Sequence, residues 1–152
     1  MEVQEKIAEL VPRLRRYARA LASAGKPPDE LVRHTLERAS QEVRVAHTQA
    51  DLRVWLFSLL HETYIQEAGP QNDEAEPQAR AANGALPFEH AMATLPPQQR
   101  EIFLLVTLED MSYEQVAKTL GIPIGTVMSR LSRAREKLRL LLMDQARVRV
   151  VK

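Results

Sequence analysis

Apolar side chains recur at spacings of three and four along most of this chain, which is the period of a helix with one buried face. Near the N-terminus Ile7, Leu10 and Leu14 follow this spacing, and near the C-terminus Val127 and Leu131 begin a second such series. No run of convincing length alternates with the period of a strand before RVRVV at the C-terminus. The pattern predicts an all-α fold.

One stretch, residues 68–87, lacks this periodicity and is rich in Pro, Gly, Asn and Gln. A length of 152 residues suits either one domain or two small ones. We therefore predict two helical units, residues 1–68 and 87–152, with an exposed acidic linker at 69–86. In the first unit, helices are expected over about 3–24, 28–45 and 51–68, with a kink or fresh helix start at Pro12 and an N-cap at Asp51.

Composition excludes several classes of function. The chain has no cysteine, so a disulfide framework and thiolate chemistry are excluded, and a cytoplasmic protein is the default expectation. It shows neither a leader pattern nor the roughly 18 consecutive apolar residues of a membrane span. The four histidines are scattered, and Glu109-Asp110 precede a helix cap, where acids need no chemistry. We expect no enzyme, metal, cofactor or small-molecule substrate.

Residues 112–139 have the order of a helix-turn-helix. Ser112 and Gln115 form a capping-box signature for a short helix that starts at Tyr113, and Gly121 suits the left-handed residue that ends it. Pro123 is expected at the first position of a long second helix. In a helix-turn-helix this second helix enters the major groove of DNA.

The second helix has two chemically different faces. At about 100° per residue, the apolar series Val127, Leu131, Ala134 and Leu138 lies opposite a polar face. That polar face contains Ser129, Ser132, Arg133 and Glu136. The serines and Arg133 are candidate base readers, because Arg can bond a guanine edge with two donors.

Three residues on the flanks of the polar face, Thr126, Arg130 and Lys137, are candidate phosphate contacts. Residues 125–152 hold 8 basic and 2 acidic side chains, an excess that favours a phosphate backbone. The alternative is an amphipathic helix whose arginine face is merely solvated. The capped helix and the turn before it favour DNA binding.

Residues 95–139, LPPQQREIFLLVTLEDMSYEQVAKTLGIPIGTVMSRLSRAREKLR, resemble region four of the extracytoplasmic-function (ECF) sigma factors of the sigma-70 family. The GTVMSRLSRARE core follows the turn with the spacing of that family. The resemblance implies that the recognition helix reads the minus-35 promoter element. It assigns this role to Thr126, Ser129, Arg130, Ser132 and Arg133.

The N-terminal half resembles region two of the same family at LVPRLRRYARAL (10–21), DELVRHTLERA (29–39) and VWLFSLL (54–60). The resemblance implies minus-10 binding and a helix that docks on core RNA polymerase. It names the following core contacts: Asp29, Glu30, Leu31, Thr35 and Arg38. Alternatively, Leu31 or Val32 packs internally and the two acids favour a helix N-terminus.

The N-terminal half also departs from the family pattern. After the WLF motif the family has a basic cluster that helps hold the minus-10 strand, whereas this chain has Glu62, Gln66 and the run EAGPQNDE. A channel for single-stranded DNA needs cations and stacking aromatic residues. Trp55 and Tyr64 could stack, but both are expected to belong to the core.

The preferred hypothesis is an alternative sigma factor that directs RNA polymerase to promoters and initiates transcription, and the resemblance implies an anti-sigma factor as a further partner. One alternative is a sigma-like protein that binds an anti-sigma factor without supporting promoter melting, because the basic cluster is lost. The other is a plain helix-turn-helix transcription regulator, since response regulators contain a similar DNA-binding half.

Overall fold

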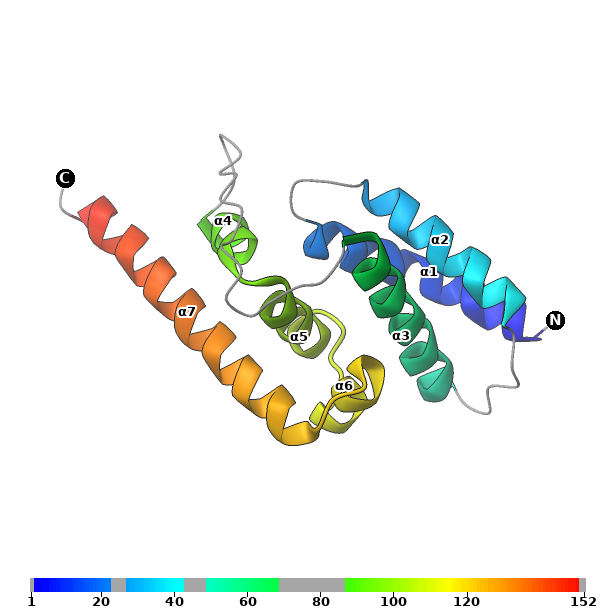
Figure 1. Ribbon diagram of the computed structural model, residues 1–152. Helices are drawn as coiled ribbons and strands as arrows, with labels where there is room; N and C mark the ends of the chain where they lie inside the picture. The colour runs from blue at the N-terminus through cyan, green and yellow to red at the C-terminus, as the bar shows by residue number, and fades with distance from the viewer. Residues whose placement is uncertain (1, 23–26, 43–48, 69–86, 151–152) are drawn as a thin grey trace.

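The computed structural model describes residues 2–22, 27–42, 49–68 and 87–150, and within these ranges the chain is helical without strands, so the all-α prediction is confirmed (Figure 1). The linker expected at 69–86 lies outside the described residues, and the helix expected to reach about residue 45 ends earlier, at Gln41, with Glu42 as its C-cap. The described helices are α1 (Glu2–Leu21), α2 (Pro28–Gln41), α3 (Gln49–Ala68), α4 (Pro87–Thr94), α5 (Pro97–Thr107), α6 (Tyr113–Leu120) and α7 (Ile124–Val150).

Helices α1, α2 and α3 pack together as the N-terminal half. Leu14 and Leu56 are fully buried between them, and the rings of Tyr17 and Phe57 meet edge to face with centroids 5.1 Å apart. Such an aromatic pair adds roughly 0.5–1.5 kcal/mol beyond the area it buries. This core therefore joins α1 firmly to α3.

Two sequence predictions for the N-terminal half concern the starts of helices. Helix α1 runs through Pro12 without a fresh start, and Pro12 is exposed, so the carbonyl that loses its donor can be hydrated. Helix α3 begins at Gln49, which places Asp51 inside the helix and makes its assignment as the N-cap wrong.

Helices α4 to α7 form the C-terminal half, in which α7 packs on α4, α5 and α6. The capping box is confirmed: the Gln115 amide donates to Ser112 Oγ at 3.1 Å, and the Ser112 amide donates to Gln115 Oε1 at 2.9 Å. Gly121 ends α6 at φ +66°, as its left-handed position requires. Pro123 precedes α7 by one residue, and its carbonyl accepts from the amide of Thr126 at 3.0 Å.

The two halves are docked on each other through α3 against α6 and α1 against α5. Figure 1 shows α7 on one side of the molecule and α1 and α2 on the other, with α3, α5 and α6 between them. The predicted polar face of α7 and the predicted polymerase-binding helix α2 therefore lie on different sides.

Candidate nucleic-acid interface

The outward face of α7 carries the predicted base readers. Val127 and Ala134 on the inner face are fully buried, whereas Ser129, Ser132 and Arg133 are exposed. The predicted division of α7 into an apolar inner face and a polar outer face is thus confirmed. The donors and acceptors of the outer face are accessible to the edges of base pairs.

Acidic Glu136 shares this outer face, and Arg139 neutralises it. The Arg139 guanidinium donates to Glu136 Oε1 at 2.6 Å and to Oε2 at 3.2 Å. This hydrogen bond lowers the pKa of the Glu136 carboxyl. The pair keeps the exposed face from presenting an uncompensated negative charge to a phosphate backbone.

The three predicted phosphate contacts, Thr126, Arg130 and Lys137, are half-buried on the flanks of the same face. Arg130 also borders a cavity of about 300 Å³ that His61 of α3 and Glu101 of α5 help to line. Burial raises the pKa of the Glu101 carboxyl, and the His61 hydrogen bond and the charges of His61, Arg130 and Arg100 oppose this rise. Arg130 thus lies between the polar face of α7 and the contact between the two halves.

Buried Arg100 of α5 bonds the ends of α4 and α1, and α7 packs on α4 and α5. Its guanidinium donates to the carbonyls of Met92 at 3.0 Å, Ala93 at 3.1 Å and Leu95 at 2.8 Å, and to the carbonyl of Leu21 at 3.0 Å. These carbonyls lie at or just after the C-terminal ends of α4 and α1, where several carbonyls lack a donor within the helix. Desolvation lowers the pKa of Arg100.

The residues predicted to contact polymerase do not share one exposed face of α2. Asp29 and Glu30 are exposed in its first turn, but Leu31 and Thr35 are buried, and Thr35 Oγ1 donates to the Leu31 carbonyl at 2.8 Å. Arg38 is half-buried and donates to Thr63 Oγ1 at 3.2 Å and to Glu62 Oε2 at 3.1 Å on α3.

The two candidate stacking residues of α3 belong to the surroundings of the core. Trp55 and Tyr64 are both half-buried and pack against buried apolar residues. Burial raises the pKa of the Tyr64 hydroxyl. The last turn of α3 contains no basic residue, so within the described residues this turn does not supply the cations that a channel for single-stranded DNA needs.

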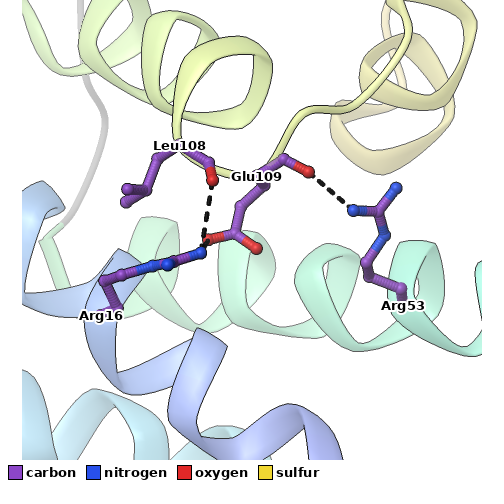
Figure 2. A network of polar contacts seen from close by, with 4 residues as sticks. All are labelled: Arg16, Arg53, Leu108 and Glu109. Carbon is purple, nitrogen blue, oxygen red and sulfur yellow. Dashed lines mark hydrogen bonds and ion pairs between the residues drawn. The ribbon is translucent and has the colours of Figure 1, made fainter.

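Sequence reasoning missed a polar junction between the halves, shown in Figure 2. Arg16 of α1 donates to Glu109 Oε2 at 3.4 Å and to the Leu108 carbonyl at 3.3 Å. Arg53 of α3 donates to the Glu109 carbonyl at 2.6 Å. The Glu109 side chain is fully buried, although Glu109 had looked like an ordinary acid before a helix cap.

A second polar contact joins the halves beside the cavity. His61 Nδ1 of α3 lies 2.8 Å from Glu101 Oε1 of α5, and their side chains are 16% and 3% exposed. Neither junction leaves a sequence signal, because the partners are 40 and 93 residues apart and belong to different amphipathic helices.

Within the described residues, no group of His, Cys, Asp and Glu could hold a metal ion, and no helix has the length and apolar character of a membrane span.

Models of known protein families match both halves of the chain. A family model described as Sigma-70, region 4, matches residues 85–138, and one described as Sigma2 domain of PhyR matches residues 7–61. The chain is 31% identical over 153 residues to the ECF RNA polymerase sigma factor EcfG of Rhodopseudomonas palustris, covering 92% of this chain and 84% of EcfG. It is 30% identical over 145 residues to the ECF sigma factor SigL of Mycobacterium tuberculosis, covering 85% and 82% respectively.

Solved structures share the same arrangement. The sigma factor RpoE of Bartonella quintana, crystallised with the anti-sigma factor NepR, superimposes with a TM-score of 0.75 at 27% identity, over 93% of this chain and 97% of RpoE. The similarity to EcfG and SigL spans most of each protein, and it includes the helix-turn-helix half whose polar face is described above. The chain therefore belongs to the ECF RNA polymerase sigma factors and is an alternative sigma factor of the sigma-70 family.

Proposed function

We propose that α7 reads the minus-35 element with Ser129, Ser132 and Arg133, while Thr126, Arg130 and Lys137 contact phosphates. The observation that supports this assignment is the exposure of the three readers directly opposite a buried apolar seam. A reader must be held rigidly to select bases, and the capped α6, the Gly121 turn and the seam of α7 hold this helix in place.

Substitution of Arg133 tests the reader assignment. Arg133→Ala should weaken minus-35 binding by about 1–3 kcal/mol and relax selectivity at one base position, because a bidentate contact to guanine is lost. Arg135→Ala is the matched control, since Arg135 is exposed on the same helix but outside the polar face. Binding to a set of duplexes with single substitutions in the minus-35 element measures both effects. Equal base selectivity in the two variants would refute the assignment.

The N-terminal half is proposed to bind core RNA polymerase through α2 and to act at the minus-10 element. Of the five predicted contacts, Asp29, Glu30 and part of Arg38 are accessible, so they form the proposed contact surface. Leu31 and Thr35 would act by packing α2 against its neighbours.

Charge reversal separates the proposed contact surface from general effects of charge. Asp29→Lys combined with Glu30→Lys should reduce capture by core polymerase, whereas Glu42→Lys, which alters an exposed acid just after α2, should not. Similar capture of the two proteins would count against the proposed surface. The protein is proposed to work in the cytoplasm, where its polymerase and DNA partners lie.

A second candidate role is supported by the match of residues 7–61 to the Sigma2 domain of PhyR and by the acidic sequence after Tyr64. In this role the chain binds an anti-sigma factor of the NepR kind without melting promoters. An anti-sigma partner fits the first role too, because RpoE of Bartonella quintana was crystallised with NepR. Run-off transcription with reconstituted core polymerase distinguishes the roles: a working sigma factor yields a promoter-specific transcript, whereas a pure decoy yields none.

A further inference from the structure

The helix-turn-helix contains two glycines, and the fold of the chain itself explains one of them. Gly121 ends α6 at φ +66°, a conformation that L side chains rarely adopt. Gly125 lies in the first turn of α7 without a positive φ, and a Cβ atom added there would meet no atom within 4 Å outside its own stretch of helix. The fold therefore gives no steric reason for glycine at position 125.

Glycine at position 125 lowers the stability of the chain. A glycine loses more backbone freedom on folding than any other residue. Where the native backbone suits an L residue, alanine in place of glycine shifts the folding equilibrium toward the folded state by about two- to fivefold. Gly125 meets this condition, because it lies in a helix with open space around it. The free space at Gly125 is thus a feature that a binding partner can use and that packing does not require.

Gly125 begins the line of residues that faces directly away from the buried seam of α7. Ser129 and Ser132 follow it at spacings of four and three residues, which place all three on one face of a helix. These three positions are exposed, whereas Val127 and Leu131 on the inner face are buried. Gly125 therefore shares a face with the two proposed serine readers and lies one turn nearer the start of the helix.

The side chains around Gly125 fit base edges, and not a phosphate, in front of this position. In a helix-turn-helix the first residues of the second helix approach base edges. Thr126 and Arg130, the proposed phosphate contacts, lie on one flank of the Gly125 face. Ile124 and Met128 lie on the other flank and are 43% and 52% exposed. Apolar side chains of this kind can pack on base edges such as the methyl group of thymine.

We propose that Gly125 is a positioning residue for promoter recognition: the absence of a side chain lets α7 lie deep enough in the major groove for Ser129 and Ser132 to reach base edges. Glycine is used where a backbone approaches a ligand closely. A serine side chain is short, so its hydroxyl reaches a base only when the helix lies close to the floor of the groove. This inference rests on the proposed function and adds to its readers a position that acts through its small size.

Two substitutions of Gly125 test the proposal, because they should change stability and DNA binding in opposite directions. Gly125→Ala should raise Tm by about 1–4 °C, since alanine restricts the unfolded chain and meets no neighbour. It should also weaken binding to a minus-35 duplex by about fivefold or more, and Gly125→Leu by about a hundredfold, because each displaced base contact contributes roughly five- to 150-fold to discrimination. Leucine also favours a helix over glycine, and it has no hydrogen-bonding group that could form a new base contact.

Arg135 provides the matched control on the same helix. It is exposed and lies outside the polar face, so Arg135→Ala and Arg135→Gly both remove its charge and differ only as alanine and glycine do. Arg135→Gly should have the lower Tm of the two by about 2–4 °C, and the duplex affinities of the two variants should be equal.

The probe for binding is a duplex that the wild-type chain selects from a random-sequence pool. Its affinity for each variant is measured at several salt concentrations, together with the affinities of duplexes that carry single base substitutions. The Gly125 variants should change base preference at one or two neighbouring positions and keep the salt dependence of the wild type. Arg130→Ala is the reference for a phosphate contact, because its loss should reduce the salt dependence. Thermal unfolding followed by circular dichroism gives Tm.

An unchanged or lower Tm of Gly125→Ala would overturn the proposal, because the fold would then account for the glycine. Wild-type affinity of Gly125→Leu, or a salt dependence reduced as in Arg130→Ala, would also overturn it, since the free space would then face no base edge. A wild type that selects no sequence would overturn it together with the reader assignment. If Arg133→Ala keeps base selectivity while the Gly125 variants behave as expected, the assignment of Arg133 fails and the close approach at Gly125 stands. The reverse pattern rejects the role of Gly125 alone.

Discussion

Replacing Arg100 with alanine should be among the most destabilising single changes in the C-terminal half. The side chain is 3% exposed, and its guanidinium donates four hydrogen bonds, all to backbone carbonyls at the ends of α4 and α1. In the Arg100→Ala variant the buried carbonyls of Leu21 and Leu95 and the half-buried carbonyl of Ala93 lose this donor, whereas the Met92 carbonyl keeps the Leu95 amide. The substitution therefore weakens the packing of the start of α5 against both the end of α4 and the end of α1.

The size of the effect follows from the partners that are lost. A hydrogen bond to a charged group contributes about 1.5–3 kcal/mol, but burial of the guanidinium offsets a large part of the sum of four. A buried carbonyl left without a donor costs about 1–3 kcal/mol, so Arg100→Ala should lower the free energy of unfolding by about 3–5 kcal/mol. For a chain of this size each kcal/mol lowers Tm by about 2–4 °C, so Tm should fall by about 10 °C.

Thermal and urea unfolding measure this effect. Arg100→Lys retains the charge but lacks the planar fork that reaches several carbonyls at once, so its Tm should lie between those of alanine and wild type. Arg19→Ala removes an exposed arginine of α1 and should change the stability by less than about 0.5 kcal/mol. A loss of under about 1 kcal/mol in Arg100→Ala would show that the four hydrogen bonds contribute little net stability, contrary to this reasoning.

Three further predictions concern the turn, the phosphate contacts and the junction. Ser112→Ala removes the cap of α6 and should lower the free energy of unfolding by about 1 kcal/mol in urea titrations, with exposed Ser40→Ala as the control. Arg130→Ala should weaken binding to all duplexes alike and reduce the slope of log affinity against log salt by about 1; an unchanged slope would exclude a phosphate contact. The pKa of Glu109 is raised from its ordinary value of 4.5, so its carboxyl contributes stability below about that pH and loses it as pH rises through the raised pKa. The free energy of unfolding of Glu109→Gln minus that of wild type should therefore increase from pH 4 toward pH 7, and a constant difference would contradict the shift.

The local features of the C-terminal half were predictable because each depends on near neighbours in sequence. The two faces of α7 follow from a period of 3.6 residues, and the Ser112 cap and the Gly121 turn require only a few adjacent residues. The errors at helix ends have the same origin: Asp51 can cap a helix in isolation, but Gln49 and Ala50 continue α3 one half-turn earlier. Local preference cannot decide between such neighbouring starts.

The junction between the halves was not predictable in this way. Arg16 and Glu109 resemble the many exposed charges of amphipathic helices, and only the docking of α1 against α5 and of α3 against α6 buries one of them. The five proposed polymerase contacts show the same limit: the alternative that Leu31 or Val32 packs internally is confirmed, but the motif DELVRHTLERA gave no sign that Thr35 also faces inward. Tertiary packing decides which member of a motif stays accessible.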